Sequence, residues 1–142
     1  MKLTFRIIRK TDFSSCAKLL IESFKEEPWN EKWKFKKAYN RIDELMSSCT
    51  SRGYVIIDDK KVVGMCIGEV MTYAGFKELW IDEFSINPAY QRKGLGSKLL
   101  AFVKKELTKE QIDHISLATG KDYPAAKFYE KNGFKVNEST YS

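Results

Sequence analysis

The spacing of apolar residues along this chain changes repeatedly between the alternation of strands and the three-to-four-residue recurrence of helices. Alternating or continuous apolar runs predict strands at residues 3–9, 54–57, 62–73, 77–86, 112–119 and 134–141. Helical recurrence predicts two helices between the first two strands, a third after residue 96 and a short fourth over residues 123–131. The predicted order is therefore β-α-α-β-β-β-α-β-α-β.

Small polar residues mark where the predicted helices begin and end. Thr11 or Asp12 can cap the first helix and Asn30 the second, because their side-chain oxygens can accept hydrogen bonds from the free amides of a first turn. Asp122 can cap the fourth helix, which Asn132-Gly133 ends because both residues tolerate left-handed backbone angles.

The order of these elements indicates an α/β fold with a mixed sheet. A polar turn over residues 58–61 joins two strands as an antiparallel hairpin, whereas the later strand–helix–strand unit requires a parallel pair. We therefore expect a mixed, partly antiparallel central sheet flanked by helices. Because no repeat or Pro/Ser-rich linker interrupts the pattern, we expect residues 1–142 to form a single domain, with a short strand after Phe134.

The distribution of charged and apolar residues argues against nucleic acid and membranes as partners. The net charge is +6 and the pI is near 9.1, but lysines alternate with acids in every segment instead of forming an arginine-rich run. The basic surface is therefore either simply solvated or attracts a polyanionic cofactor, and we expect no nucleic-acid partner. No apolar run approaches the ~20 residues that span a bilayer, so we expect no membrane partner.

Metal and disulfide chemistry are also unexpected. The chain has one histidine, His114, and no Cys-x-x-Cys motif, so we expect no metal site. Cys16 and Cys49 lie on predicted apolar helix faces, and Cys66 lies in an apolar strand. Buried free thiols and the absence of a signal-peptide pattern lead us to expect a cytoplasmic protein.

The basic, glycine-rich stretch between residues 87 and 98 predicts an anion site. It follows a strand and opens a helix, where free amides and the positive end of the helix dipole meet. Gly94 and Gly96 would let the amides approach a bulky anion, and Arg92, Lys93 and Lys98 add positive charge. The stretch matches neither the P-loop nor the dinucleotide fingerprint. The alternative is a tight turn that uses glycine for geometry alone.

Two segments carry a family resemblance. Gln91-x-x-Gly94-x-Gly96 resembles the coenzyme A pyrophosphate loop of the GCN5-related N-acetyltransferases (GNAT superfamily). The segment from Asp122 to Phe134, with Tyr129-Glu130-Lys131, resembles the second hallmark of that family, in the same order along the chain. Asp122 departs from the asparagine usual in the family. The predicted element order also matches the family fold, and the chain is similar to aminoglycoside 6′-N-acetyltransferases and small-amine acetyltransferases.

The resemblance implies transfer of an acetyl group from acetyl-coenzyme A to a primary amine of a small molecule or peptide, by direct attack in a ternary complex. The alternative is a non-catalytic acyl-coenzyme A-binding or regulatory module of the same fold. Many members of the family dimerise, so a homodimer is the assembly that the resemblance implies. The residues that it assigns to the cofactor are Phe84, Ser85, Ile86, Gln91, Arg92, Lys93, Gly94, Leu95, Gly96, Ser97 and Asp122.

The resemblance also places catalytic groups. Tyr129 matches the tyrosine that protonates the leaving thiolate, and a phenol holds its proton at neutral pH. The alternative is that Tyr129 is only a core aromatic. Strand alternation should point the Asp82 and Glu83 side chains to opposite faces of the sheet, so that only one of them can face the substrate. The resemblance implies Asp82 as the base, with Glu83 second, because similar aminoglycoside 6′-N-acetyltransferases carry a strand acid at this distance before the loop. Either acid could instead form a salt bridge or act through a water chain.

Recognition of the acceptor is expected in the link between the first two helices. Glu27, Trp29 and Trp33 form an acidic, aromatic cluster that could hold a cationic amine by charge and by stacking on indole. The alternative is that the two indoles only pack the helix junction together.

Overall fold

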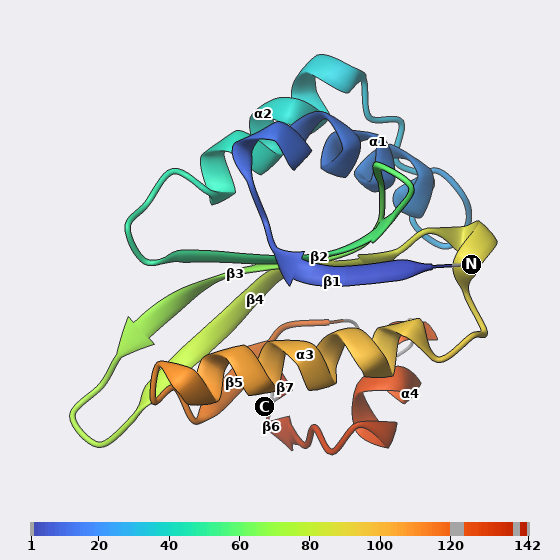
Figure 1. Ribbon diagram of the computed structural model, residues 1–142. Helices are drawn as coiled ribbons and strands as arrows, with labels where there is room; N and C mark the ends of the chain where they lie inside the picture. Colours follow the sequence, from blue (N-terminus) through green and yellow to red (C-terminus); the bar gives the residue numbers. More distant parts are fainter. Residues whose placement is uncertain (1, 120–123, 138–139, 142) are drawn as a thin grey trace.

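One mixed sheet organises the chain (Figure 1). The computed structural model describes residues 2–119, 124–137 and 140–141, in which the strand order is β1-β2-β3-β4-β5-β7-β6. Among the described strands, the β4–β5 pair is parallel and the other pairs are antiparallel. The strands are β1 (Leu3–Ile7), β2 (Ser51–Asp58), β3 (Lys61–Thr72), β4 (Lys77–Ile86), β5 (His114–Leu117), β6 (Val136–Asn137) and β7 (Thr140–Tyr141).

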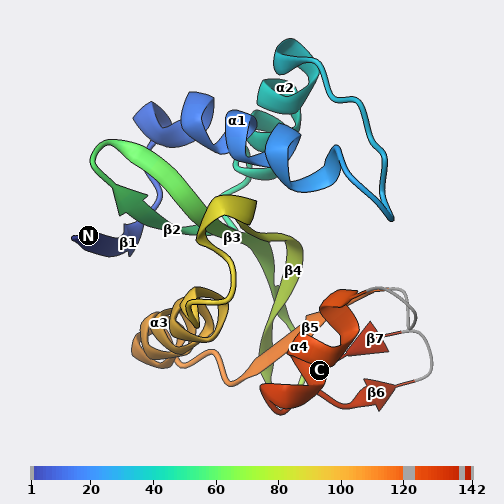
Figure 2. The same ribbon diagram turned by 90° about the vertical axis from the view of Figure 1, so that its right-hand side faces the viewer.

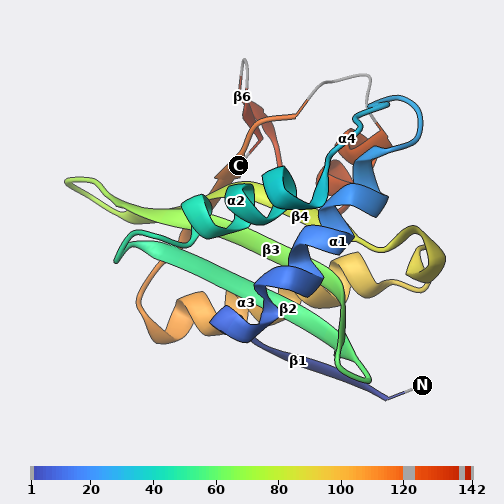
Figure 3. The same ribbon diagram turned by 90° about the horizontal axis from the view of Figure 1, so that it is seen from above.

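Helices cover both faces of this sheet. The helices α1 (Phe13–Phe24) and α2 (Phe35–Leu45) lie on one face, and α3 (Leu95–Lys109) and α4 (Pro124–Lys131) lie on the other (Figure 1). Seen from above, α1 and α2 cross β2, β3 and β4 (Figure 3). The predicted α/β class, element order and flanked mixed sheet are therefore confirmed. The final region contains two strands of two residues each, where the sequence predicted one short strand.

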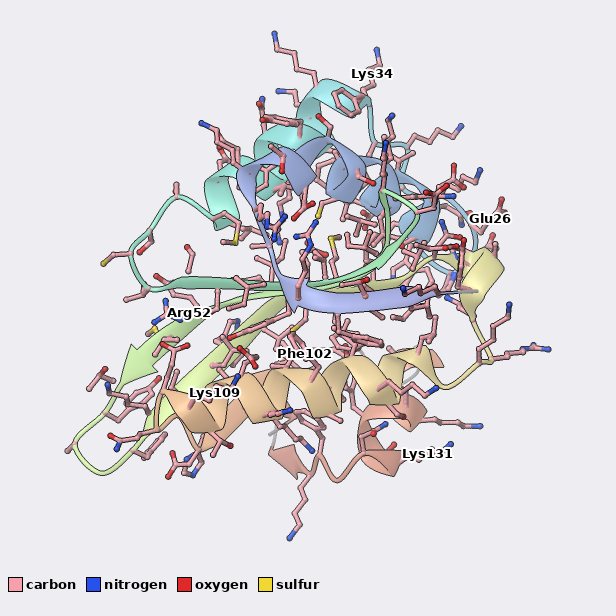
Figure 4. The ribbon with its side chains drawn as sticks, in the orientation of Figure 1. Glu26, Lys34, Arg52, Phe102, Lys109 and Lys131 are labelled. Carbon is pink, nitrogen blue, oxygen red and sulfur yellow. The ribbon has the colours of Figure 1, made fainter. Side chains whose placement is uncertain are left out.

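Each face of the sheet has its own apolar core. Successive residues of a strand point to opposite faces, so Met65 packs under α1 and α2 while its neighbour Cys66 packs over α3 and α4. Phe102 of α3 turns toward the sheet, where its ring centroid lies 6.1 Å from that of Phe5 and 6.2 Å from that of Tyr54 (Figure 4). The central strands are thus buried on both sides, which holds the strand ends in place for the site described below.

The start of α2 lies later in the chain than the sequence predicted. Asn30 does not cap this helix, because the segment after α1 folds back: the Glu31 amide donates to the Phe24 carbonyl at 2.7 Å. Asn30 instead has a left-handed backbone with a φ of 50°, and Lys34 precedes the first helical residue. Residues 25–34 therefore form a loop that is tied to the end of α1.

The predicted burial of the cysteines is confirmed for Cys16 and Cys66 and is wrong for Cys49. Cys49 is exposed because α2 ends at Leu45, so the apolar stripe expected to carry it does not extend that far.

Asp12 precedes α1, and the sequence offered its side chain as a cap for the free amides of that helix. The structure shows no such hydrogen bond. The Asp12 carboxylate instead accepts hydrogen bonds from both Arg6 terminal nitrogens, at 2.7 and 2.9 Å, and from the Arg9 amide at 2.7 Å. Asp12 is 7% exposed. Burial alone would raise the pKa of Asp12, but the Arg6 and Arg9 hydrogen bonds outweigh it and hold the pKa below its ordinary value. This pair joins β1 to α1.

Replacing Asp12 by alanine should lower the free energy of unfolding by about 2–3 kcal/mol, because Arg6 then loses its buried partner. The pKa of Asp12 is depressed on folding. The contribution is therefore fully present above the pKa of an unfolded aspartate, about 4, and is lost as the pH falls through the lower folded value. Urea unfolding followed from neutral to acid pH should show wild type and variant converging in acid.

Asp43→Ala on the exposed side of α2 is the control, and it should change the free energy of unfolding little at any pH. A difference between wild type and Asp12→Ala that stays constant into acid would contradict the role of the ion pair.

Candidate active site

A cavity of about 980 Å³ lies where β4 and β5 separate. The two strands pair only over Glu78–Ile81 and His114–Leu117, and the residues that follow these pairs along the chain line the cavity. The loop between α1 and α2 lies on the same side of the molecule as α4 (Figures 2 and 3). The cavity is lined by both of these segments, so it connects the α1 face of the sheet with the α4 face through the gap between the strands.

A β-bulge sits at the point of separation. In the β3–β4 register, Ile67 pairs with Glu83 and Gly68 pairs with Ile81, so Asp82 is an extra residue. The bulge changes the alternation: Ile81 and Phe84, three residues apart, both pack toward α3 and α4.

The expectation that Asp82 and Glu83 point to opposite faces is therefore wrong. Both acids line the same cavity, and the charge of Arg41 acts on both. Simple alternation fails here because the bulge inserts one residue between two regularly paired segments.

Glu83 is held by an arginine that the sequence did not single out. Arg41 of α2 donates from Nε at 3.1 Å and from Nη2 at 2.9 Å to the same oxygen, Glu83 Oε2. The Glu83 side chain is 11% exposed. Burial raises the pKa of Glu83 above its ordinary value, although the Arg41 charge and hydrogen bond oppose the rise. Glu83 is thus an anchored carboxylate whose other oxygen, Oε1, has no hydrogen bond to the residues that the structure describes.

Asp82 lies in the same cavity but is less buried. Burial raises its pKa as well, and the charge of Arg41 again opposes the rise. The two acids therefore form a negatively charged patch beside the gap between the strands.

Tyr129 reaches the cavity from α4 and is also part of the core. It is 6% exposed, and its ring packs against Phe84, Phe128 and Phe134 with centroids 5.2–6.0 Å apart. Burial raises the pKa of the Tyr129 hydroxyl, and the nearby Cys66 and Glu83 add to the rise. The hydroxyl therefore keeps its proton at neutral pH, and it lies within electrostatic range of Glu83.

The glycine-rich stretch forms a loop that ends at the first turn of α3. Asn87 opens it by accepting a hydrogen bond from the Ala89 amide at 2.9 Å, and the Tyr90 hydroxyl donates to Asp58. Arg92 and Gly94 have left-handed backbones, with φ values of 65° and 73°. No described side chain caps α3, so the amides of its first turn remain available to an anion.

The two glycines of this loop are required for different reasons. At Gly94 the left-handed backbone favours glycine, and an added Cβ would meet nothing within 4 Å. At Gly96 an added Cβ would lie 2.8 Å from the Phe128 ring of α4. Gly96 is therefore needed for the close packing of α3 on α4, in addition to any approach of an anion.

Most of the predicted site residues come together in this cavity. Those that line it are Glu27, Trp29, Asp82, Glu83, Phe84, Ser85, Ile86, Gln91, Arg92, Gly94, Leu95, Gly96, Ser97 and Tyr129. Lys93 and Trp33 are not among the lining residues: the Lys93 ammonium lies over the Tyr90 ring at 5.7 Å, and the Trp33 indole donates to Glu31 at 2.7 Å. Asp122 lies outside the described residues.

Sequence reasoning missed two groups of this site. Arg41 belongs to no local motif, and only the packing of α2 over β4 brings it to Glu83. Ser23, in the last turn of α1, lines the cavity without any sequence signal that could have identified it.

Comparison with known proteins now decides the family. The sequence model described as the acetyltransferase (GNAT) family matches residues 14–134. The chain belongs to the GNAT family. Acyl transfer is the general activity of this family. A search of curated proteins found no significant match.

Solved structures share the fold of this GNAT protein at low sequence identity. A GNAT family acetyltransferase from Staphylococcus aureus has a TM-score of 0.75 and 18% identity, covering 98% of this chain and 96% of that one. The ribosomal-protein-S18-alanine N-acetyltransferase of Escherichia coli has a TM-score of 0.76 and 20% identity, covering 96% and 79%. The PaiA N-acetyltransferase of Thermoplasma acidophilum, in complex with coenzyme A, has a TM-score of 0.73 and 23% identity, covering 99% and 96%.

Two further findings concern the described residues of this GNAT protein. They contain no group of three or more His, Cys, Asp or Glu side chains that could hold a metal ion. None of their helices has the length and apolar character needed to cross a membrane.

The contact between α3 and α4 can be tested by coupling two substitutions. Gly96→Ala should lower the free energy of unfolding by about 1–3 kcal/mol, because the new methyl group overlaps the Phe128 ring. In a Phe128→Leu background the same change should cost less, since the smaller side chain leaves room. Urea unfolding of the four proteins measures this coupling.

Gly94→Ala is the matched control, because its cost arises from the left-handed backbone and should be the same in both backgrounds. An equal cost of Gly96→Ala with Phe128 and with Leu at that position would show that the close packing is not the reason for glycine.

Proposed function

We propose that this GNAT protein is an N-acetyltransferase that moves an acetyl group from acetyl-coenzyme A to a primary amine by direct attack. One observation carries the proposal. A single cavity joins the uncapped start of α3, the protonated Tyr129 hydroxyl and the anchored Glu83 carboxylate at the gap between β4 and β5.

The donor half of the cavity fits the chemistry of coenzyme A. The free amides at the start of α3, with Arg92 beside them, suit a pyrophosphate. The β4 residues beyond Ile81 have lost their β5 partner, so main-chain groups of Phe84 and the Ile86 amide are available to the pantetheine arm, whereas the Ile86 carbonyl accepts a hydrogen bond from Gln91 Nε2 at 3.3 Å. Acetyl-coenzyme A, when bound, supplies the thioester that the amine attacks.

Glu83 is better placed than Asp82 to act as the base, although the sequence favoured Asp82. Glu83 is the more buried acid, its orientation is set by Arg41, and its charge acts on Tyr129. The raised pKa of Glu83 makes it a stronger base than an ordinary carboxylate. Its free oxygen, Oε1, can take the proton that the attacking amine must lose.

Tyr129 is the group proposed to assist the departing sulfur. As the carbon–nitrogen bond forms and the carbon–sulfur bond breaks, negative charge develops on the sulfur. The raised pKa of Tyr129 favours hydrogen-bond donation to this charge over complete loss of the phenolic proton. The proton that Glu83 takes from the amine then passes to the thiolate. The products are the N-acetylated amine and free coenzyme A, so the reaction balances.

The acceptor half of the cavity favours a cationic molecule. Glu27 and the two acids of β4 supply negative charge at its lining, and Arg41 is already engaged by Glu83. Trp29 contributes an aromatic surface that packs edge-on against Phe24, with centroids 5.4 Å apart. Trp33 is oriented by its bond to Glu31 and has no part in the proposed acceptor contact.

The direct test is release of free thiol from acetyl-coenzyme A in the presence of a panel of primary amines. An N-acetyltransferase releases coenzyme A in an amine-dependent way and yields the N-acetylated product by mass spectrometry. Binding of coenzyme A without release in the presence of any amine would support the non-catalytic module instead.

Tyr129→Phe should lower kcat by about 10²–10⁴-fold, because it removes the hydroxyl but keeps the ring in the aromatic core. Steady-state kinetics with a saturating donor measure this effect. Tyr54→Phe is the control: Tyr54 is equally buried, does not line the cavity, and should leave kcat unchanged. An unchanged kcat for Tyr129→Phe in a chemistry-limited assay would remove the proposed role.

The choice of base predicts a difference between the two acids. Glu83→Gln should lower kcat/KM by about 10²–10⁴-fold, whereas Asp82→Asn should cost less than about 10-fold. Arg41→Gln removes a charge that lowers the pKa of Glu83. The rise of kcat/KM with pH should therefore move to higher pH in that variant. The opposite ranking of the two acid variants would return the role to Asp82.

A further inference from the structure

Two serine hydroxyls in the acceptor half of the cavity have no hydrogen-bond partner. Within the described part of the chain, the buried side-chain polar atoms that lack a partner are Ser23 Oγ, Ser85 Oγ and Tyr54 Oη. Both serines line the cavity, whereas Tyr54 does not. Burying an unpaired hydroxyl destabilises a protein, so such groups in native structures need an explanation. The gathering of two of them in one cavity indicates a ligand that supplies the missing partners.

The two hydroxyls come from two different elements that line the cavity, the strand β4 and the helix α1. Ser85 is 5% exposed and pairs on the neighbouring strand with Met65, whose side chain lies in the core under α1 and α2. Its side chain is therefore on the α1 face of β4. Ser23 lies in the last turn of α1, the helix that covers that face of the sheet (Figure 1).

Ser85 also lies two residues beyond Glu83 on the same face of the strand. The pairing of Glu83 with Ile67 and of Ser85 with Met65 is regular, because both residues follow the bulge. Their spacing is therefore that of an ordinary strand, about 6.6 Å. A small ligand that binds both side chains at once would place its nitrogen at Glu83 and a second polar atom at Ser85, with both atoms between the two side chains. The two ligand atoms are then about 3–5 Å apart, which corresponds to two or three intervening carbons.

We propose that the acceptor is a small primary amine that carries a hydroxyl group two or three carbons from its nitrogen, held by Ser23 and Ser85 beside Glu83. This inference rests on the proposed N-acetyltransferase function. A ligand hydroxyl can donate to one serine and accept from the other, which satisfies both buried groups. An otherwise equal amine without the hydroxyl leaves them unpaired and is a poorer substrate.

The test compares two matched pairs of amines with acetyl-coenzyme A as donor: 2-aminoethanol with propylamine, and 3-aminopropan-1-ol with butylamine. Wild type should favour the hydroxylated member of at least one pair by about 10-fold in kcat/KM. Ser85→Ala should bring that preference close to one. It should leave the KM for acetyl-coenzyme A unchanged, because the proposed contacts with the pantetheine arm use main-chain groups of β4 and not the Ser85 side chain. Because the amines of a pair differ in basicity, each preference is compared between wild type and variant at the same pH.

Ser116→Ala is the matched control. Ser116 is 6% exposed on the adjacent strand β5, and its Oγ donates to Glu78 at 2.5 Å outside the cavity. This variant should have a lower Tm and an unchanged preference for the hydroxylated amine. Ser85→Ala should not lower the Tm of the ligand-free protein, because its hydroxyl has no partner to lose.

The remaining outcomes separate the two levels of the proposal. Equal kcat/KM within each pair, a preference that Ser85→Ala leaves intact, or a lowered Tm for Ser85→Ala would overturn the hydroxyl subsite alone. Release of coenzyme A with peptide amines only would also overturn the subsite while leaving the acetyltransferase function standing. Binding of coenzyme A without release by any primary amine would remove both.

Discussion

The candidate site depends on the loss of hydrogen bonding between β4 and β5 after Ile81 and Leu117. In a continuous sheet the main-chain groups that follow would pair with each other. Here the strands separate, and the cavity between them is lined by residues from both faces of the sheet. The bulge at Asp82 lies at this point, where an extra residue bends β4 and the pairing of β4 with β5 stops, while its pairing with β3 continues. The rest of the fold holds the separated strand ends in place.

Beyond the bulge, the two faces of β4 border chemically different environments. Phe84 packs toward α3 and α4, where the loop before α3 presents its free amides. Glu83 and Ser85 point toward α1 and α2, where Arg41 anchors the carboxylate. The strict alternation of a strand therefore separates an apolar, main-chain-rich donor side from a polar, negatively charged acceptor side without any change of element.

Prediction from the sequence succeeded for features that depend only on residues close together in the chain. The glycine loop, the helix that follows it and the segment around Tyr129 are local patterns, and most of their residues line one cavity. Prediction failed where two elements must meet. The parity argument for Asp82 and Glu83 assumed a regular strand, and the bulge that breaks it appears only when β4 is paired with β3. Likewise, Asn30 is a suitable cap, but the backbone contacts of its loop with α1 delay the start of α2 to Phe35.

By itself the sequence determined the order of strands and helices, the mixed sheet and the family, because apolar periodicity and short motifs act over a few residues. Only the tertiary structure decided which acid is anchored, since Arg41 and Glu83 are brought together by the packing of α2 over β4. It also decided that Gly96 is required by Phe128, and that Ser23 and Ser85 share one cavity without partners. These properties depend on distances between residues far apart in the chain, and no periodicity within the chain encodes them.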